Sequence, residues 1–217
     1  MSLRGLLRRV FTLGRGLSVG MPEDALGRDP IELFGDWFEA AAQASLAEPT
    51  AMTLATCTRD ARPSARMVLL KSFDQRGFVF FTNYGSRKAR ELEENPRAAL
   101  VFYWQPLLRQ VRVEGTVERV GTAASRAYFA SRPRGSRIGA WASRQSEALD
   151  SRAHLAARVR RLERQFSGAE VPLPEFWGGY RVIPQRIEFW QGRASRLHDR
   201  ACFERDGAGW RSYWMYP

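Results

Sequence analysis

Turn signals divide the chain into many short apolar stretches, and this pattern restricts the fold more than any other feature of the sequence. Residues 59–63, residues 74–77 and the pair Asp206-Gly207 are turn sequences that each separate two such stretches. The expected strands lie at residues 51–58, 64–73, 78–82, 98–104, 109–119, 179–184, 186–191, 201–205 and 210–213. Short strands at hairpin spacing are typical of an antiparallel barrel or sandwich.

Helical segments interrupt the strands at a few places. Asp29 and Pro30, followed by apolar residues at helical spacing, predict a capped helix that runs to about residue 46. Residues 136–143 are ambiguous, and further helices are expected at residues 86–95 (capped by Ser86), 122–131 (capped by Thr122) and 148–166. We therefore predict a mainly β fold with flanking helices, in which the helices decorate a β-barrel.

The composition is that of a globular chain. Of its 217 residues 44% are hydrophobic, and no apolar run approaches the ~20 residues that a bilayer-spanning helix needs. Cys57 and Cys202 form no metal-ligand pattern, and with only His154 and His198 beside them a metal site is not expected. A single disulfide is one interpretation of the two cysteines; reduced thiols in the cytoplasm are the preferred one.

The chain is strongly basic, with a formal net charge of +11. Arginine carries nearly all of the positive charge, because Lys71 and Lys88 are the only lysines. Nucleic acid, a membrane surface and a small phosphorylated ligand are the partners that such a charge attracts, and charge alone does not separate them. We expect residues 1–25 to be a mobile basic segment, with a transit peptide or membrane-surface helix as the alternative, and residues 26–217 to form a single domain.

Two segments put cations beside strand or helix ends. Alternation in the strand after residue 63 puts Arg66 and Lys71 on opposite faces, where each needs an anionic partner unless it lies in water. Ser86 opens a helix whose free N–H groups suit a phosphate. Arg87 and Lys88 oppose the helix dipole at this point, so either a bound anion or plain exposure to solvent would explain them.

A third segment holds Trp190, Arg196, His198 and Arg200. On a strand, the last three would share one face and could hold an anion and a polar ring together; a charged edge strand with His198 paired to Asp199 is the alternative. The sequence contains no dinucleotide-binding glycine motif, P-loop, HExxH zinc motif or GxSxG nucleophile motif. Redox chemistry on a bound cofactor is then the simplest explanation for these residues.

Several longer runs carry a resemblance to a known family. They are SRPRGS at residues 131–136, GAWAS at 139–143, WGGYRV at 177–182, EFWQG at 188–192 and RLHDR at 196–200. In this order they resemble the pyridoxamine 5'-phosphate oxidase family, and the resemblance covers nearly everything past residue 25. It implies an FMN-binding split β-barrel of the Greek-key type, and a homodimer with two FMN sites at the subunit interface.

The resemblance also implies roles for individual residues. FMN would be held by Arg66, Met67, Val68, Leu69, Leu70, Lys71, Phe81, Thr82, Arg87, Lys88, Gln110, Gln145, Ser146, Trp190 and Arg200. The substrate phosphate would meet Lys71, Tyr128, Arg132 and Ser136. Arg196 and His198 would hold the pyridine ring over the flavin as the catalytic pair, with Arg196 stabilising charge and His198 orienting the substrate.

The implied reaction is the oxidation of pyridoxamine or pyridoxine 5'-phosphate to pyridoxal 5'-phosphate. Oxygen is the electron acceptor and gives hydrogen peroxide, and the amine substrate also releases ammonia. Two departures from the family pattern stand out. No Tyr precedes Tyr84, although the family often has an Arg and a Tyr near its N-terminus, and the chain ends in Trp-Met-Tyr-Pro rather than Arg-Leu-x-Pro.

Three other functions are alternatives to this one. A split-barrel relative that oxidises a different substrate would be separated by substrate profiling. A non-enzymatic module for flavin or vitamin B6 would bind flavin without producing peroxide. A nucleic-acid binder would gather its basic residues on one exposed face beside stacking aromatics, whereas here they spread along the chain and fall on ligand motifs.

Overall fold

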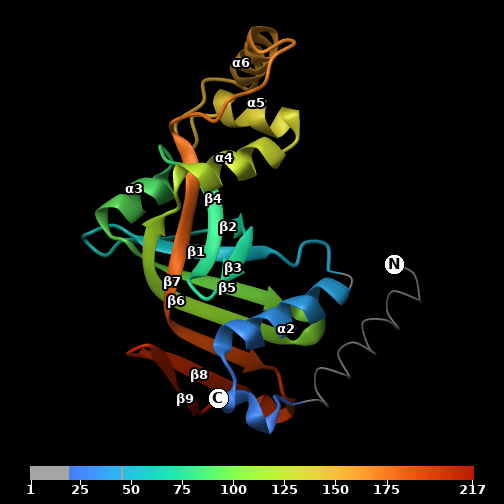
Figure 1. The fold of residues 1–217 in the computed structure, drawn as a ribbon, viewed down its shortest axis with the longest axis vertical. Helices are drawn as coiled ribbons and strands as arrows, with labels where there is room; N and C mark the ends of the chain where they lie inside the picture. Colours follow the sequence, from blue (N-terminus) through green and yellow to red (C-terminus); the bar gives the residue numbers. More distant parts are fainter. Residues whose placement is uncertain (1–19, 45) are drawn as a thin grey trace.

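A curled antiparallel sheet forms the body of the protein in the computed structural model, which describes residues 20–44 and 46–217 (Figure 1). The sheet has the order β2-β1-β5-β6-β7-β4-β3, with β8 added to β7 and β9 added to β8. Strand β2 also approaches β4, so the sheet curls back towards itself. The strands are β1 (Ala51–Cys57), β2 (Pro63–Leu69), β3 (Ser72–Asp74), β4 (Gly77–Asn83), β5 (Arg97–Trp104), β6 (Arg109–Arg119), β7 (Trp177–Gln191), β8 (Asp199–Asp206) and β9 (Gly209–Trp214).

Helices gather at one end of this sheet and also pack beside and against it (Figure 1), which confirms the predicted mainly β fold with flanking helices. The α-helices are α2 (Pro30–Gln43), α3 (Arg87–Glu94), α4 (Thr122–Ser131), α5 (Arg134–Ala142) and α6 (Arg152–Gln165), and the short 3-10 helices are η1 (Glu23–Gly27), η2 (Gln105–Leu107) and η3 (Ala194–Arg196). Asp29 caps α2 as predicted, because its side chain accepts the N–H groups of Ile31 and Glu32. The predicted cap Ser86 is confirmed in position, whereas the predicted cap Thr122 is wrong by one residue. Gly121 precedes α4, and Ser86 stands at the N-cap of α3 without a capping hydrogen bond from its side chain.

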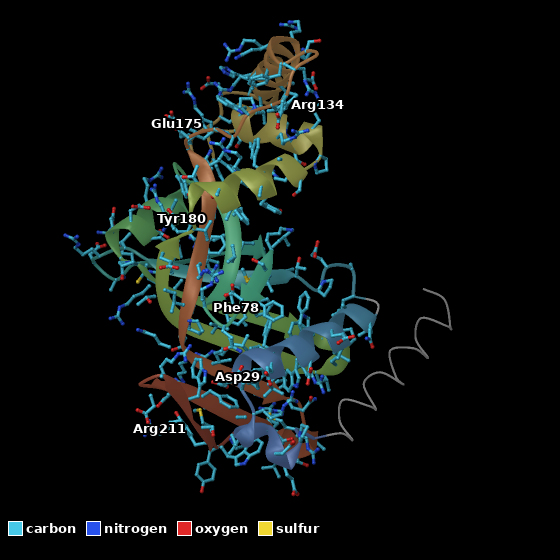
Figure 2. The ribbon with its side chains drawn as sticks, in the orientation of Figure 1. Asp29, Phe78, Arg134, Glu175, Tyr180 and Arg211 are labelled. Atoms are coloured by element: carbon cyan, nitrogen blue, oxygen red, sulfur yellow. The ribbon has the colours of Figure 1, made fainter. Side chains whose placement is uncertain are left out.

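The main core lies between α2 and the curled sheet. Phe34 at its centre makes edge-to-face contacts with Phe73, Phe78 and Phe102 at centroid distances of 4.9, 4.8 and 5.0 Å. Figure 2 shows Phe78 in the body of the sheet. Such aromatic pairs add to the stabilisation that comes from burying their area, and they hold α2 against the sheet.

A second core joins α4, α5 and α6 at one end of the molecule (Figure 1). Phe129, Ile138 and Leu162, one from each helix, are buried in it together with Trp177 at the start of β7. Residues 136–143, which were ambiguous in sequence, are helical here as part of α5. The long strand β7 therefore connects this helical end to the opposite end of the sheet.

Two expectations about strand boundaries were wrong. Residues 179–184 and 186–191 form one continuous strand, because a β-bulge at Gln185 absorbs the interruption at Pro184: Gly115 pairs with Pro184, and its neighbour Glu114 pairs with Arg186. A Cβ on Gly115 would lie 2.0 Å from the carbonyl oxygen of Ile183, so only glycine fits at this close approach. Conversely, residues 64–73 are two strands, β2 and β3, separated by Leu70 and Lys71.

Candidate functional site

A cavity of about 870 Å³ opens between β2, the β2–β3 connection, β4, the start of α3 and the helices α4 and α5. Its volume is in the range of small-molecule and cofactor sites. It is lined by Ser64, Ala65, Arg66, Met67, Val68, Leu69, Lys71, Phe81, Thr82, Asn83, Arg87, Lys88, Tyr128, Arg132, Ser136, Gly139, Ala140, Ser143, Gln145, Ser146 and Trp177. Most of the residues predicted to bind FMN or the substrate phosphate therefore lie together, although nothing in the sequence spacing brings α4 and α5 next to β2.

Five cations line this cavity: Arg66, Lys71, Arg87, Lys88 and Arg132. None of the described residues that line it is acidic. Cationic side chains gathered around a partly enclosed space attract anions and bind phosphate oxygens through charge-assisted hydrogen bonds. The donor set thus fits a phosphorylated ligand.

The charge of Arg66 is compensated within the protein by Glu91. Its Nη1 donates to the Thr56 hydroxyl at 2.5 Å and to the carbonyl oxygen of Leu54 at 3.2 Å, and its Nη2 lies 3.2 Å from a carboxylate oxygen of Glu91. The predicted alternation of β2 is confirmed, since Ser64, Arg66 and Val68 share its half-buried face. Lys71 follows the end of the strand and is exposed, so it needs no buried partner.

Lys88 is buried at the edge of the cavity. Its ammonium group donates to Gln145 Oε1 at 2.9 Å, to the Thr82 hydroxyl at 3.2 Å and to the Ser86 hydroxyl at 3.4 Å. Burial, with the charge of Arg66 as a second cause, lowers the pKa of Lys88 to about 8. The group is therefore charged at neutral pH and titrates just above it.

This pKa predicts a pH-dependent affinity for a phosphorylated ligand such as FMN. Below about pH 8 Lys88 already carries its proton, whereas at higher pH the ligand must draw a proton onto it, so the dissociation constant is expected to rise by up to about tenfold per pH unit. Flavin titrations between about pH 7 and pH 9.5 measure the slope. Lys88→Met should bind more weakly with little slope, and Lys71→Met, the matched change at the other lysine, should keep it. A slope that survives in Lys88→Met would contradict the assignment.

An aromatic wall closes one side of the cavity. Phe81 stacks on Tyr128 at 4.2 Å and on Trp177 at 5.5 Å between ring centroids. The guanidinium of Arg132 lies 4.8 Å from the centre of the Trp177 ring, and its Nη1 is buried without a hydrogen-bond partner among the described residues. A buried donor with no partner costs free energy, so Arg132 is ready to receive an anionic oxygen.

A second group of predicted residues lies far from this cavity, at the other end of β7. Gln110, Trp190 and Arg200 occupy one row across β6, β7 and β8, because Gln110 pairs with Trp190 and Trp190 pairs with Arg200. Arg200 donates to the buried carboxylate of Glu188 at 2.9 Å and to the carbonyl oxygen of Tyr216 at 2.9 Å. The C-terminal segment, whose sequence differs from the family pattern, therefore still contacts the predicted site residue Arg200.

His198 belongs to this second group. Its ring lies 4.6 Å from the Trp190 ring, and its Nδ1 accepts the backbone N–H of Arg193 at 3.1 Å. In a neutral imidazole the proton then resides on Nε2, which leaves that nitrogen as a hydrogen-bond donor. This tautomer suits the orientation of a ligand better than proton abstraction.

The expectation that Arg196, His198 and Arg200 share one face of a strand was wrong. Arg196 ends η3, and His198 lies in the connection before β8 begins at Asp199. Ser195 and Arg196 both have positive φ, at 56° and 61°, and two consecutive residues in this conformation do not occur in a regular strand. None of Gln110, Trp190, Arg196, His198 and Arg200 lines the cavity, and Leu70, although buried, does not line it either.

No group of three or more His, Cys, Asp and Glu side chains in residues 20–44 and 46–217 could hold a metal ion. In the same part of the chain, no helix combines the length and the apolarity that crossing a membrane requires. The predicted basic segment covers residues 1–25, and its residues 1–19 are outside the part of the chain that the structure describes.

The curled sheet and its cation-lined cavity define the class of protein as a split β-barrel. A family model described as pyridoxamine 5'-phosphate oxidase matches residues 38–166, and a second, described as the pyridoxine 5'-phosphate oxidase C-terminal dimerisation region, matches residues 177–217. The chain belongs to the pyridoxamine 5'-phosphate oxidase family.

Sequence and structure comparisons with individual proteins support this family membership. A pyridoxine/pyridoxamine 5'-phosphate oxidase of Rubrobacter xylanophilus is 61% identical over 97% of this chain and 95% of its own length. The protein of that name from Colwellia psychrerythraea is 51% identical over 100% of both chains. Among solved structures, PhzG from Burkholderia lata in complex with tetrahydrophenazine-1-carboxylic acid is 34% identical, with a TM-score of 0.88 over 93% of this chain and 100% of that chain.

Proposed function

We propose that the protein oxidises pyridoxamine 5'-phosphate and pyridoxine 5'-phosphate to pyridoxal 5'-phosphate, with FMN as cofactor and oxygen as electron acceptor. The observation that carries this proposal is the gathering of five cations around one cavity, on residues that match the family's ligand motifs. Two phosphorylated ligands, the cofactor and the substrate, explain so many cations better than one. The names of relatives at 61% and 51% identity support the same reaction.

The residues fit FMN. Arg66, Arg87 and Lys88 gather at the start of α3 and suit its phosphate, while Gln145 and Ser146 supply polar groups on the α5–α6 connection. FMN, when bound, would supply the acceptor for the hydride equivalent lost from the substrate carbon C4', with oxygen as the final electron acceptor and hydrogen peroxide as its product. The chain itself contributes binding, orientation and charge placement.

The remaining cavity residues suit the substrate phosphate. Lys71, Tyr128, Arg132 and Ser136 lie on the part of the lining formed by the β2–β3 connection, α4 and α5. Arg132, with its buried and unpartnered Nη1, is the strongest candidate among them. The phosphate would be held here so that C4' is presented to the flavin, and with the amine substrate the product imine is hydrolysed to the aldehyde and ammonia.

We infer that the second group of residues completes the site of a partner copy in a homodimer. Trp177 lines the cavity and Trp190 lies thirteen residues further along the same strand, which at 3.3 Å per residue is roughly 40 Å of chain. Gln110, Trp190, Arg196, His198 and Arg200 can therefore act on FMN and substrate only from a second copy. The match of residues 177–217 to a dimerisation region supports this arrangement.

Two broader assignments accompany this function. Residues 26–217 would act as one domain, since β7 takes part in the sheet and contributes Trp177 to the helical core. A cytoplasmic location is supported by Cys57 and Cys202, which are both free thiols in the structure, because disulfides are rare in that compartment.

A second candidate function is the oxidation of an unphosphorylated ring acid, which the likeness to PhzG in its tetrahydrophenazine-1-carboxylic acid complex favours. The cations at Lys71 and Arg132 argue for a phosphorylated substrate instead. Turnover of pyridoxamine 5'-phosphate compared with unphosphorylated pyridoxamine separates the two candidates.

The test of the proposed function is a visible spectrum of the purified protein before and after the addition of pyridoxamine 5'-phosphate without oxygen. The expected result is a flavin band that bleaches, recovers in air and leaves pyridoxal 5'-phosphate in solution. A flavin band that never bleaches would favour the second candidate. A protein that does not take up FMN would contradict both.

A further inference from the structure

Glu91 is a buried acid beside the cavity and is not among the site residues predicted from the sequence. Only 3% of its surface is exposed, and it lies on α3, one turn after Arg87. It does not line the cavity itself. A carboxylate is buried in this way only when its charge and its lone pairs are compensated by nearby groups.

The compensation comes from four donors on three elements. One carboxylate oxygen accepts the hydroxyls of Thr56 and Ser64, each at 2.5 Å, and the Nη2 of Arg66 at 3.2 Å. The other oxygen accepts the Nε of Arg87 at 2.8 Å. Burial alone would raise the pKa of Glu91, but these hydrogen bonds outweigh it and lower the pKa to about 2. The acid is therefore ionised throughout the physiological range.

Glu91 thereby joins two cations of the cavity that come from different elements, Arg66 on β2 and Arg87 on α3. Nη1 of Arg66 donates to Leu54 and Thr56, and its Nη2 donates to Ser64 and Glu91. The Nε–H group is therefore the donor that Arg66 can offer to a ligand. Arg87 uses its Nε for Glu91 and keeps both Nη groups available. A long arginine side chain has many rotamers, and fixing it before binding removes that entropy cost from the binding step.

We propose that Glu91 is a positioning residue that holds Arg66 and Arg87 in the geometry that binds the phosphate of FMN. This inference rests on the proposed function, because it takes FMN as the ligand of the cavity. For the affinity for FMN, the positioning role predicts a change opposite in direction to the change that charge alone predicts. Removing a negative charge beside an anion site should strengthen phosphate binding by Coulomb attraction alone, whereas the loss of a positioning group should weaken it.

Two substitutions separate these effects. Glu91→Gln keeps the shape and removes the charge, and its amide NH₂ would face groups that are themselves donors, so one arginine is released. Glu91→Asp keeps the charge but is one methylene shorter, so it cannot reach both arginines. Glu94→Gln removes one charge from an exposed position on the same helix and is the matched control.

The experiment measures the dissociation constants of FMN and of riboflavin, which lacks the phosphate, by fluorescence quenching with the full-length protein freed of flavin. Both Glu91 variants should bind FMN about tenfold more weakly, with riboflavin affinity changed by less than about twofold. Glu94→Gln should match the wild type. On a background of Arg66→Ala and Arg87→Ala together, Glu91→Gln should have little further effect on FMN affinity, because it acts through the two arginines.

The outcomes are distinguishable. Tighter binding of FMN to Glu91→Gln, an unchanged Glu91→Asp, or an equal loss of FMN and riboflavin affinity would overturn the positioning role while the proposed function stands. A wild-type protein that binds no FMN would overturn the proposed function and this inference with it. If Glu91→Gln does not fold, Glu91→Asp alone decides, because a pure charge effect leaves that variant unchanged.

Discussion

Replacing Arg196 by alanine is expected to lower kcat by about 100-fold or more while FMN stays bound, since a charged group that stabilises a transition state is worth that much. Arg196 makes no side-chain hydrogen bond or ion pair with any described residue, so its loss leaves no buried partner behind. Stopped-flow reduction of the bound flavin by pyridoxamine 5'-phosphate measures the effect. Arg152→Ala, an exposed arginine on α6, is the control. Loss of flavin in proportion to activity would contradict the proposed role.

The same variant tests the composite site. Arg196→Ala subunits have an intact cavity, and Arg132→Ala subunits have an intact Arg196. If each site takes its cavity from one copy and Arg196 from the other, mixing the two inactive proteins under conditions that exchange subunits should restore activity, because each mixed dimer contains one site with neither defect. No recovery after proven subunit exchange would mean that Arg196 serves the cavity of its own chain.

Arg66→Ala is expected to weaken FMN binding by about 10- to 100-fold, equivalent to about 1.4–2.8 kcal/mol. The variant loses a cation of the cavity and also removes one of the two arginines that compensate the buried Glu91. Flavin titration of the protein freed of cofactor measures the affinity, and thermal unfolding of the same preparation reports the stability cost separately.

Arg62→Ala is the matched control for this change. Arg62 lies just before the same strand, and its side chain is 80% exposed in an ion pair with Asp60; exposed pairs of this kind contribute little. It should bind FMN like the wild type. A fully flavinated and fully active Arg66→Ala protein would refute the phosphate assignment.

Much of the fold could be predicted from local sequence. Asp29-Pro30 determines where α2 begins, and Gly207 of the pair Asp206-Gly207 begins the two-residue turn between β8 and β9. The errors arose where tertiary pairing overrides a local signal. Pro184 indicated a break between two strands, but the bulge beside it keeps β7 continuous, and no local pattern reveals that β6 supplies the partner for this bulge.

The sequence identified candidate site residues one by one but not their arrangement. Arg66, Lys88 and Arg132, which were predicted to bind FMN or the substrate phosphate, line one cavity, yet sequence could not show that Arg196 and His198 lie at the opposite end of β7. Ser195 and Arg196 both have positive φ. Because neither residue is a glycine, the sequence contains no local signal that this segment is a loop and not a strand. Glu91 was missed, although its i,i+4 spacing from Arg87 is the kind of pattern that indicates a helical ion pair.

The two lysines of the chain have a consequence for what happens after turnover. Pyridoxal 5'-phosphate is an aldehyde that condenses with the amine of lysine, whereas the guanidinium of arginine stays protonated and forms no such bond under ordinary conditions. Lys71 and Lys88 both line the cavity, so no lysine elsewhere in the chain can capture the released product covalently. The cationic side chains outside the cavity are therefore arginines, and a released aldehyde meets no lysine side chain there that it could label.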